Sequence, residues 1–220
     1  MVKKMKILIV TGGSIDVSFA REYLKNRFFD KIIAADSGLR HCCGLGITPT
    51  EIVGDFDSLR DRELLFRYSS QGIPIKTFPK RKDDTDTQLA AGYAAGYHPK
   101  EIVFLGATGT RYDHTLANIG LLEGLSDEGI DGKIVDAHNE IRMFCGKTEK
   151  IFSRQEDWPY FSLVAWAGNV TGIDLAGFSY PLTNKTLTTS VSLGISNEIE
   201  KEKAVLRMKS GHLLVIRSRD

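Results

Sequence analysis

The sequence predicts an α/β fold, in which an N-terminal, mostly parallel sheet with flanking helices is followed by an all-β C-terminal sandwich domain. In the first two thirds of the chain, short apolar runs alternate with amphipathic stretches at the spacing of strand–helix–strand units. After about Gly146, short β-branched segments punctuated by Gly or Asn follow one another closely, without a helical period. We therefore expect two domains, residues 1–146 and residues 147–220.

The apolar runs of the first domain predict strands over residues 6–10, 31–35, 51–53, 73–78, 101–105 and 133–135. The helical pattern is clearest over residues 85–97 and 113–125. Continuous apolar runs such as residues 32–35 are typical of parallel strands that are covered on both faces. In the second domain, strands are expected over residues 161–166, 168–173, 186–191 and 212–216.

Composition excludes several classes of protein. Hydrophobic residues make up 42% and charged residues 26% of the 220 residues, as in ordinary globular proteins. The net charge of +1 argues against nucleic acid or an anionic membrane as a partner. The apolar run that follows Lys6 ends at Val10, too early for a membrane span or signal sequence, so we expect a cytoplasmic protein. Cysteines and histidines show no zinc-ligand spacing, which leaves a hard cation with oxygen ligands open.

Polar or glycine-rich segments follow four consecutive predicted strands. In an open parallel sheet, ligands bind outside the carboxyl ends of the strands. The segments are Asp36-Ser37-Gly38, Gly54-Asp55-Phe56-Asp57-Ser58, Lys82-Asp83-Asp84-Thr85-Asp86 and the run from Gly106 to His114. We therefore expect one site at this edge of the sheet.

Asp55 and Asp57 are candidate ligands of a divalent cation. If the extended conformation continues beyond the strand, residues two apart point to the same side. Mg²⁺ typically takes one or two carboxylates together with substrate phosphate oxygens. Alternatively, Asp57 and Ser58 cap a helix that begins near Leu59, which explains one aspartate but not both.

The segment from Lys82 to Gln88 places three carboxylates in four positions at a predicted helix start. Thr85 and Gln88 match a capping box, and acidic residues in a first turn complement the helix dipole, so a purely structural role is a strong alternative. Capping does not need all three carboxylates, however, and a cation would relieve their mutual repulsion. We favour Asp84 and Asp86 for metal or phosphate binding, with Lys82 neutralising phosphate charge.

The run from Gly106 to Arg111 leads into a helix whose expected N-cap is Asp113. A glycine-containing loop at a helix N-terminus offers backbone N–H groups to an anion, and Arg111 can add a bidentate contact. His114 and Asn118 lie one helical turn apart and could both face the site, although a capping or core histidine is about equally compatible with the pattern.

These four segments, followed in order by Gly194-Ile195-Ser196-Asn197-Glu198, resemble the thiamin pyrophosphokinase family. The resemblance implies Mg²⁺-dependent transfer of the pyrophosphoryl group of ATP to thiamine, with Asp55, Asp57 and Asp84 as metal ligands and Asp86 supporting them. It implies that Lys82 and Arg111 stabilise the negative charge that develops on the phosphate oxygens during the transfer. Substrate-binding residues implied by the resemblance are Asp36, Ser37, Thr108, His114, Asn118, Tyr180, Ser196 and Asn197. It also implies a homodimer with the active site at the subunit interface.

Two alternatives remain open at this stage. Asp55-Phe56-Asp57-Ser58 after an apolar strand imitates the nucleophile motif of Mg²⁺-dependent phosphatases of the haloacid dehalogenase type, which form an aspartyl-phosphate. A non-catalytic protein that binds thiamine or nucleotide is the second. The chain also departs from the family at Thr110, where many members carry a glycine, and Thr110 would restrict the loop if that position required a positive φ.

Overall fold

The computed structural model describes residues 5–56, 62–78 and 84–220. The chain forms two compact units, Met1–Ala137 and His138–Asp220. Residues 138–146, which the sequence-based division assigns to the first domain, thus belong to the second compact unit. Each unit is described separately below.

The sheet of the first unit is parallel throughout its described strands. Its strand order is β4-β3-β2-β1-β5-β6. The strands are β1 (Lys6–Val10), β2 (Lys31–Ala35), β3 (Glu51–Gly54), β4 (Ile75–Thr77), β5 (Glu101–Leu105) and β6 (Asp131–Val135). The predicted parallel sheet is therefore confirmed. Ile7, Leu8, Ile9 and Val10 are fully buried, as expected for a strand with helices on both faces.

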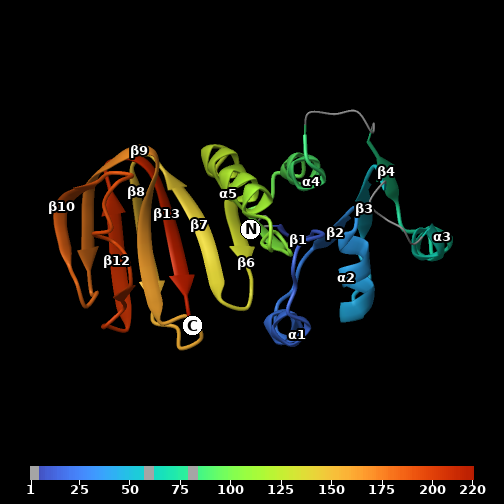
Figure 1. Ribbon diagram of the computed structural model, residues 1–220, viewed down its shortest axis with the longest axis horizontal. Coiled ribbons are helices and arrows are strands. Elements are labelled where there is room, and N and C mark those ends of the chain that lie inside the picture. The colour runs from blue at the N-terminus through green and yellow to red at the C-terminus, as the bar shows by residue number, and fades with distance from the viewer. Residues whose placement is uncertain (1–4, 57–61, 79–83) are drawn as a thin grey trace. The chain divides into compact units, whose positions relative to one another are not determined.

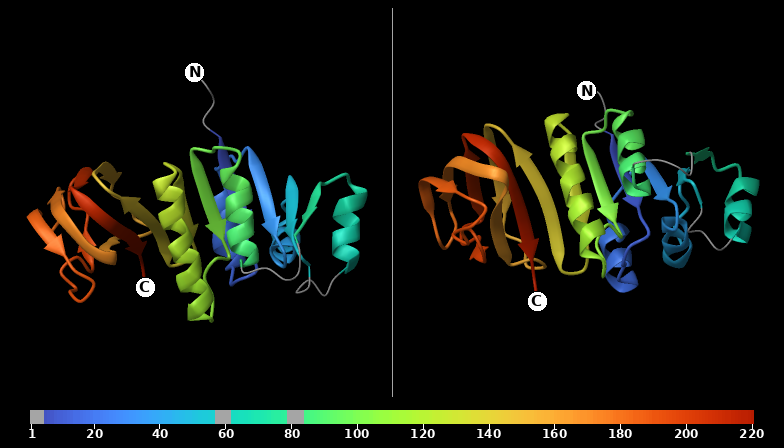
Figure 2. Two further views of the ribbon diagram at one scale, coloured as in Figure 1. Left: turned by 90° about the horizontal axis from the view of Figure 1, so that it is seen from above. Right: turned by 45° about the horizontal axis from the view of Figure 1, so that its top comes forward.

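Helices cover both faces of this sheet (Figures 1 and 2). They are α1 (Val17–Lys25), α2 (Gly38–Leu45), α3 (Arg62–Ser70), α4 (Asp86–Ala95) and α5 (Tyr112–Asp127). The chain first runs outward from β1 to β4, then returns to the other side of β1 and continues through β5 to β6. Because such crossovers are right-handed, α1 and α2 lie on one face and α4 and α5 on the other (Figure 1). The direction of winding therefore reverses between β1 and β5.

The two predicted helix starts differ in outcome. Thr85 is the N-cap of α4, and its side-chain oxygen accepts a hydrogen bond from the backbone N–H of Gln88 at 3.2 Å, as the capping-box pattern predicts. Asp113 was expected to cap α5, and this is wrong: the helix begins at Tyr112 with Arg111 as N-cap. Asp113 lies in the first turn, where an acidic side chain complements the helix dipole without capping the helix.

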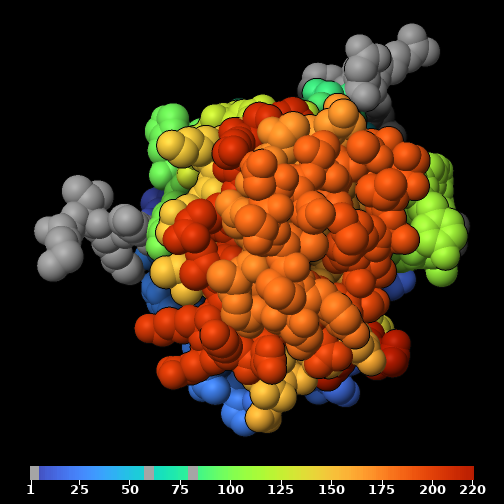
Figure 3. All heavy atoms as spheres, turned by 90° about the vertical axis from the view of Figure 1, so that its left-hand side faces the viewer, coloured from blue at the N-terminus to red at the C-terminus, as the bar shows by residue number. Residues whose placement is uncertain are grey.

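The second unit is antiparallel. Its strands are β7 (Asn139–Cys145), β8 (Thr148–Ser153), β9 (Tyr160–Ala176), β10 (Leu182–Leu187), β11 (Asn197–Glu198), β12 (Lys203–Met208) and β13 (Ser210–Ser218). The first half of β9 pairs mainly with β13 and with β11, whereas its second half pairs with β10 and β12. The two layers enclose one apolar core, so the predicted sandwich is confirmed. Figure 3 looks onto the face of this unit that carries β10 and β12.

The separate strands expected over residues 161–166 and 168–173 are wrong, because both lie in the single strand β9. Ala167 and Gly168 have positive φ angles of 51° and 135° at their junction. Such a local irregularity bends the strand, so that β9 passes from one layer to the other without ending. The strand expected over residues 186–191 is also displaced, since β10 ends at Leu187.

Aromatic rings dominate the core of the second unit. The Phe161 ring lies 4.9 Å, between centroids, from those of both Phe152 and Phe178. The buried guanidinium of Arg217 lies over the rings of Phe152 and Phe161 and donates to the carbonyl oxygen of Ser153. Burial lowers the pKa of Arg217. In the described part of the chain, no helix is both long and apolar enough to cross a membrane.

Candidate active site

A cavity of about 530 Å³ lies in the first unit, at the carboxyl ends of its strands. Residues 11–14, 35–37, 84–87 and 106–111 line it, together with His114, Thr115 and Asn118 of α5. The structure therefore brings together eight predicted site residues, which are Asp36, Ser37, Asp84, Asp86, Thr108, Arg111, His114 and Asn118. Asp57 and Lys82 lie outside the described residues.

Residues 11–14 are not among the predicted site residues, yet they form one wall of this cavity. They connect β1 to α1, while residues 106–111 connect β5 to α5, so the cavity lies at the point where the winding direction of the sheet reverses. Open α/β sheets bind ligands in the crevice at this switch point. The Thr-Gly-Gly-Ser run after the first apolar strand was the available signal, but only the strand order places it beside β5.

The loops after β1 and β5 are joined by their backbones. Gly13 N donates to Gly106 O and Ser14 N donates to Thr108 O, both at 2.8 Å. The hydroxyl of Thr11 also donates to Gly106 O. A Cβ atom at position 13 would lie 2.3 Å from Gly106 O and 2.4 Å from Thr108 O, so only glycine permits this approach. These contacts give the wall of the cavity a fixed shape.

The loop after β5 is also held from its far side. The buried side chain of Asn118 donates to Ala107 O at 2.8 Å. The hydroxyl of Thr108 donates to Asp136 Oδ2, beyond the end of β6, at 2.9 Å. Gly106 has a φ of 76°, which glycine adopts without strain, whereas Thr110 is not among the residues with positive φ. The loop therefore accommodates Thr110 in an ordinary backbone conformation.

Arg111 and Asp113 form an exposed ion pair beside the cavity. Arg111 Nη2 lies 2.5 Å from Asp113 Oδ2, and Arg111 Nε lies 3.2 Å from Asp113 Oδ1. The hydrogen bond with Asp113 raises the pKa of Arg111, and the same contact lowers the pKa of Asp113. Exposed ion pairs contribute little to stability, so Arg111 can exchange this partner for an anionic ligand at small cost. The side chain of Arg111, the N-cap residue of α5, makes no capping hydrogen bond.

Three carboxylates meet at the ends of different elements. Asp36 follows β2, Asp55 follows β3 and Asp86 begins α4, and one oxygen atom from each lies within 4.8 Å of the others. Asp36 is buried and has a positive φ of 45°. The oxygen-only donor set is the kind that a hard divalent cation prefers.

This cluster differs in part from the predicted ligand set. Asp55 belongs to both, whereas Asp36 was predicted to bind substrate and Asp86 to support the metal ligands. Within the described residues, Asp84 is not part of the cluster. Its Oδ1 instead accepts a hydrogen bond from Gln88 Nε2 at 2.6 Å. The periodicity of the sequence could not distinguish Asp84 from Asp86, because the choice depends on how the first turn of α4 is oriented.

The remaining predicted residues, Tyr180, Ser196 and Asn197, lie in the second unit. Asn197 Oδ1 accepts from Tyr180 N at 3.0 Å, and Asn197 Nδ2 donates to Tyr180 O at 2.8 Å. Asn197 is buried, while the Tyr180 side chain is exposed. Ser196 has a positive φ of 54°, and its backbone N–H donates to the hydroxyl of Ser162 at 3.0 Å. The buried amide therefore fixes the backbone that presents the tyrosine ring to solvent.

Comparisons with protein families match both units. Residues 21–134 match the model of the thiamin pyrophosphokinase catalytic domain, and residues 148–213 match the thiamin pyrophosphokinase vitamin B1 binding domain. The chain is 34% identical over 188 residues to a thiamine pyrophosphokinase of Bacillus subtilis, covering 86% of this chain and 87% of the relative.

Solved structures are similar over nearly the full chain. A crystal structure of thiamine pyrophosphokinase from Bacillus subtilis superposes with a TM-score of 0.87 at 31% identity, covering 98% of this chain and 99% of that one. A thiamin pyrophosphokinase from Geobacillus thermodenitrificans gives a TM-score of 0.86 at 28% identity, with 98% of each chain covered.

Proposed function

The chain belongs to the thiamin pyrophosphokinase family, and we propose that it transfers the pyrophosphoryl group of ATP to thiamine, giving thiamine diphosphate and AMP. The family matches support this function over a haloacid dehalogenase-type phosphatase and over a non-catalytic binding protein. The observation that carries the proposal is the cavity at the β1/β5 switch point, where two glycine-containing loops lie beside a cluster of carboxylates.

Asp36, Asp55 and Asp86 are the described residues that would hold Mg²⁺, with Asp57 and Asp84 as further proposed ligands. The fit rests on three oxygen donors that converge from separate elements, without histidine or cysteine among them. When bound, Mg²⁺ supplies positive charge to the triphosphate of ATP. The clustered aspartates also keep the site selective for a nucleotide that arrives with its cation, because a bare triphosphate would be repelled.

The triphosphate is proposed to lie along the residue 106–111 loop and the N-terminus of α5. Support comes from the start of α5, where the N-cap side chain makes no capping hydrogen bond, and from the exposed guanidinium of Arg111. Lys82 is the second proposed cation. In the transfer, the hydroxyl oxygen of thiamine attacks the β-phosphorus of ATP and gives up its proton, and the bond from that phosphorus to the oxygen of AMP breaks. Positioning and charge stabilisation supply most of the catalysis in such reactions.

Thiamine is proposed to bind through Tyr180, Ser196 and Asn197, since an exposed aromatic ring suits a flat cation. A homodimer with the active site at the subunit interface is proposed from the family resemblance. Large apolar side chains exposed next to this segment, namely Val191, Leu193 and Ile195, support it. The proposed location is the cytoplasm, where ATP is available and where three free cysteines suit a reducing environment.

The test is to incubate the protein with ATP, Mg²⁺ and thiamine and to measure AMP and thiamine diphosphate by chromatography, with thiamine omitted as the control. Equal, thiamine-dependent amounts of both products are expected. Ligand binding without AMP formation would support the non-catalytic alternative. A hydroxylamine-labile phosphoenzyme would instead support the phosphatase.

A further inference from the structure

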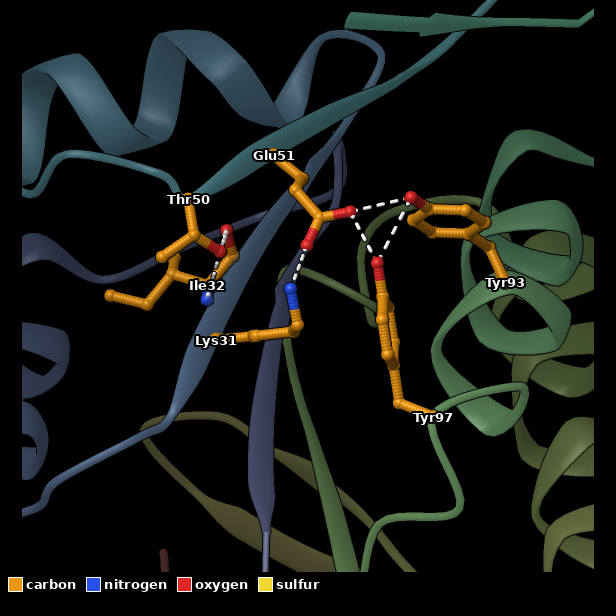
Figure 4. A network of polar contacts seen from close by, with 6 residues as sticks. All are labelled: Lys31, Ile32, Thr50, Glu51, Tyr93 and Tyr97. Atoms are coloured by element: carbon orange, nitrogen blue, oxygen red, sulfur yellow. Dashed lines mark hydrogen bonds and ion pairs between the residues drawn. The ribbon is translucent and has the colours of Figure 1, made fainter. Parts of the chain in front are cut away.

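A network of polar side chains lies at the amino ends of β2 and β3 (Figure 4). These are the strand ends opposite those that border the cavity. Glu51 Oε2 accepts hydrogen bonds from the hydroxyls of Tyr93 at 2.5 Å and Tyr97 at 2.8 Å. Its Oε1 pairs with the ammonium of Lys31, which also lies 4.2 Å from the centre of the Tyr97 ring. The two hydroxyls are 3.1 Å apart, so the network ties the last turn of α4, through Tyr93, and the segment just after it, through Tyr97, to two strands.

The packing of α4 explains why this attachment matters. The buried residues of α4 are Ala90, Ala91, Ala94 and Ala95. Alanines allow a helix to approach a sheet closely, but they present no large side chain that interlocks with neighbours and opposes sliding along the helix axis. Directional hydrogen bonds to a buried carboxylate oppose such sliding. We therefore expect the tyrosine hydroxyls to determine the position of α4 along its axis.

The other end of α4 begins at Asp86, one of the three clustered carboxylates. A helix of 10 residues moves as a rigid rod about 15 Å long, so a shift at Tyr93 displaces Asp86 by a similar amount. Asp36 and Asp55 belong to loops after β2 and β3, the strands whose amino ends carry Lys31 and Glu51. The network thus connects the elements that supply all three carboxylates.

We propose that Glu51, Tyr93 and Tyr97 are positioning residues, which set the placement of Asp86 relative to Asp36 and Asp55 and thereby the affinity for a divalent cation. The inference rests on the proposed function of this cluster as the metal site. None of the three residues touches the cavity. Their effect therefore reaches the site through α4 and not through contacts of their own with ATP or thiamine.

The test uses Mn²⁺ as a probe, titrated into the full-length protein without nucleotide and followed by electron paramagnetic resonance. Tyr93→Phe removes one hydroxyl and leaves the ring in place. We expect the dissociation constant for Mn²⁺ to rise about threefold, and about tenfold in the double variant Tyr93→Phe/Tyr97→Phe. Hydrogen exchange of the α4 amides should accelerate in parallel, while the KM for thiamine stays within twofold.

Tyr23→Phe is the matched control, because Tyr23 is a buried tyrosine on α1, on the opposite face of the sheet. It should leave Mn²⁺ affinity unchanged. In the Asp86→Asn background, adding Tyr93→Phe should no longer change Mn²⁺ affinity, since the side chain that it positions is no longer charged.

Two outcomes would separate this inference from the proposed metal site. If Asp86→Asn itself leaves Mn²⁺ affinity unchanged, the metal site is wrong and the positioning role falls with it. If Asp86→Asn weakens Mn²⁺ binding but the tyrosine variants do not, only the positioning role is overturned. The same fold-change for Tyr93→Phe with and without Asp86→Asn would also overturn it, because it would indicate a general loss of structure.

Discussion

Backbone strain marks individual residues of the candidate site. Asp36, Phe56 and Ser196 all have positive φ, at 45°, 61° and 54°, and all lie in the segments predicted to bind ligand. Such conformations cost on the order of 1 kcal/mol for a residue with a Cβ atom and tend to persist where function requires them. Asp is one of the residue types that adopts this region most readily, so the charge and the backbone role of Asp36 can be separated.

Asp36→Asn should retain the fold and lose activity. Asparagine tolerates positive φ as well as aspartate does, but it removes the charge proposed to hold Mg²⁺. We expect turnover to fall by about 100-fold with little change in melting temperature. Asp36→Ala should lose activity to a similar extent and additionally about 1 kcal/mol of stability, because alanine is strained at this φ. Thiamine-dependent AMP formation and thermal unfolding measure the two effects, and full activity in Asp36→Asn would remove Asp36 from the metal site.

Gly13→Ala should damage the cavity wall. Its Cβ atom would collide with the carbonyl oxygens of Gly106 and Thr108, so the two loops must separate. We expect a loss of about 1 to 3 kcal/mol in stability and a raised KM for ATP. Gly44→Ala is the control, since a Cβ atom at that helical position meets nothing within 4 Å. It should stabilise the protein slightly, by about 0.5 kcal/mol, and a similar KM in both variants would contradict the role of Gly13.

At the scale of elements, the attachment of α4 to β2 and β3 should depend on pH. Burial raises the pKa of Glu51, but the hydrogen bonds from Lys31, Tyr93 and Tyr97 outweigh it, and the pKa lies below the ordinary value of 4.5. The hydrogen bond that Lys31 donates to Glu51 raises the pKa of Lys31 above 10.5. A carboxyl group whose pKa is lowered by folding stabilises the fold at pH values above its pKa in the unfolded chain. This stabilisation is lost as the pH falls through the pKa of the folded state. A lysine whose pKa is raised by folding stabilises the fold at pH values below 10.5. This stabilisation is lost as the pH rises through the pKa of the folded state.

Glu51→Gln should therefore destabilise the protein between pH 5 and pH 10, by about 1.5 to 3 kcal/mol. The difference from the unmodified protein should shrink as the pH falls below 4.5 and through the lowered pKa of Glu51 in the folded protein. Urea unfolding at a series of pH values measures this. Glu101→Gln removes a carboxylate that pairs with Lys133 at 2.6 Å in the same sheet and serves as a comparison without a link to α4. A constant difference for Glu51→Gln across the whole pH range would show that its charge does not contribute.

At the scale of the whole molecule, the proposed dimer can be tested at its exposed apolar segment. Leu193 is 53% exposed and lies two positions from each of the exposed residues Val191 and Ile195. Leu193→Lys would place a charge in this surface and should shift the protein from dimer to monomer in analytical ultracentrifugation, with loss of activity. Ile151 on β8 is 65% exposed, and Ile151→Lys should leave the dimer intact. A monomeric parent protein, or equal effects of both variants, would contradict the proposed interface.

Much of the architecture follows from the sequence because it depends on local chemistry. Continuous apolar runs predicted β1, β2, β3 and β5 nearly to the residue, since a strand covered on both faces is apolar at consecutive positions over its buried part. The Thr85 cap was also correct, because its hydrogen bond spans only three residues. Acidic and glycine-rich segments after the strands predicted the edge of the sheet at which the cavity lies.

Tertiary structure decided what depends on contacts between distant segments. Residues 11–14 became part of the cavity because β1 lies beside β5 in the sheet. This strand order brings together residues about 95 positions apart, and no local sequence pattern indicates it. In the sequence, the bend at Ala167 looked like the end of one strand and the start of another, because a strand that changes layers loses its regular pattern there. The grouping of Asp36 and Asp55 with Asp86 rather than Asp84 depends on the position of α4, which its alanines and distant tyrosine contacts determine. Sequence thus determined which chemical groups reach the carboxyl ends of the strands, and three-dimensional packing decided which of them meet. The physical reason is that distances between side chains in space cannot be read from their spacing along the chain.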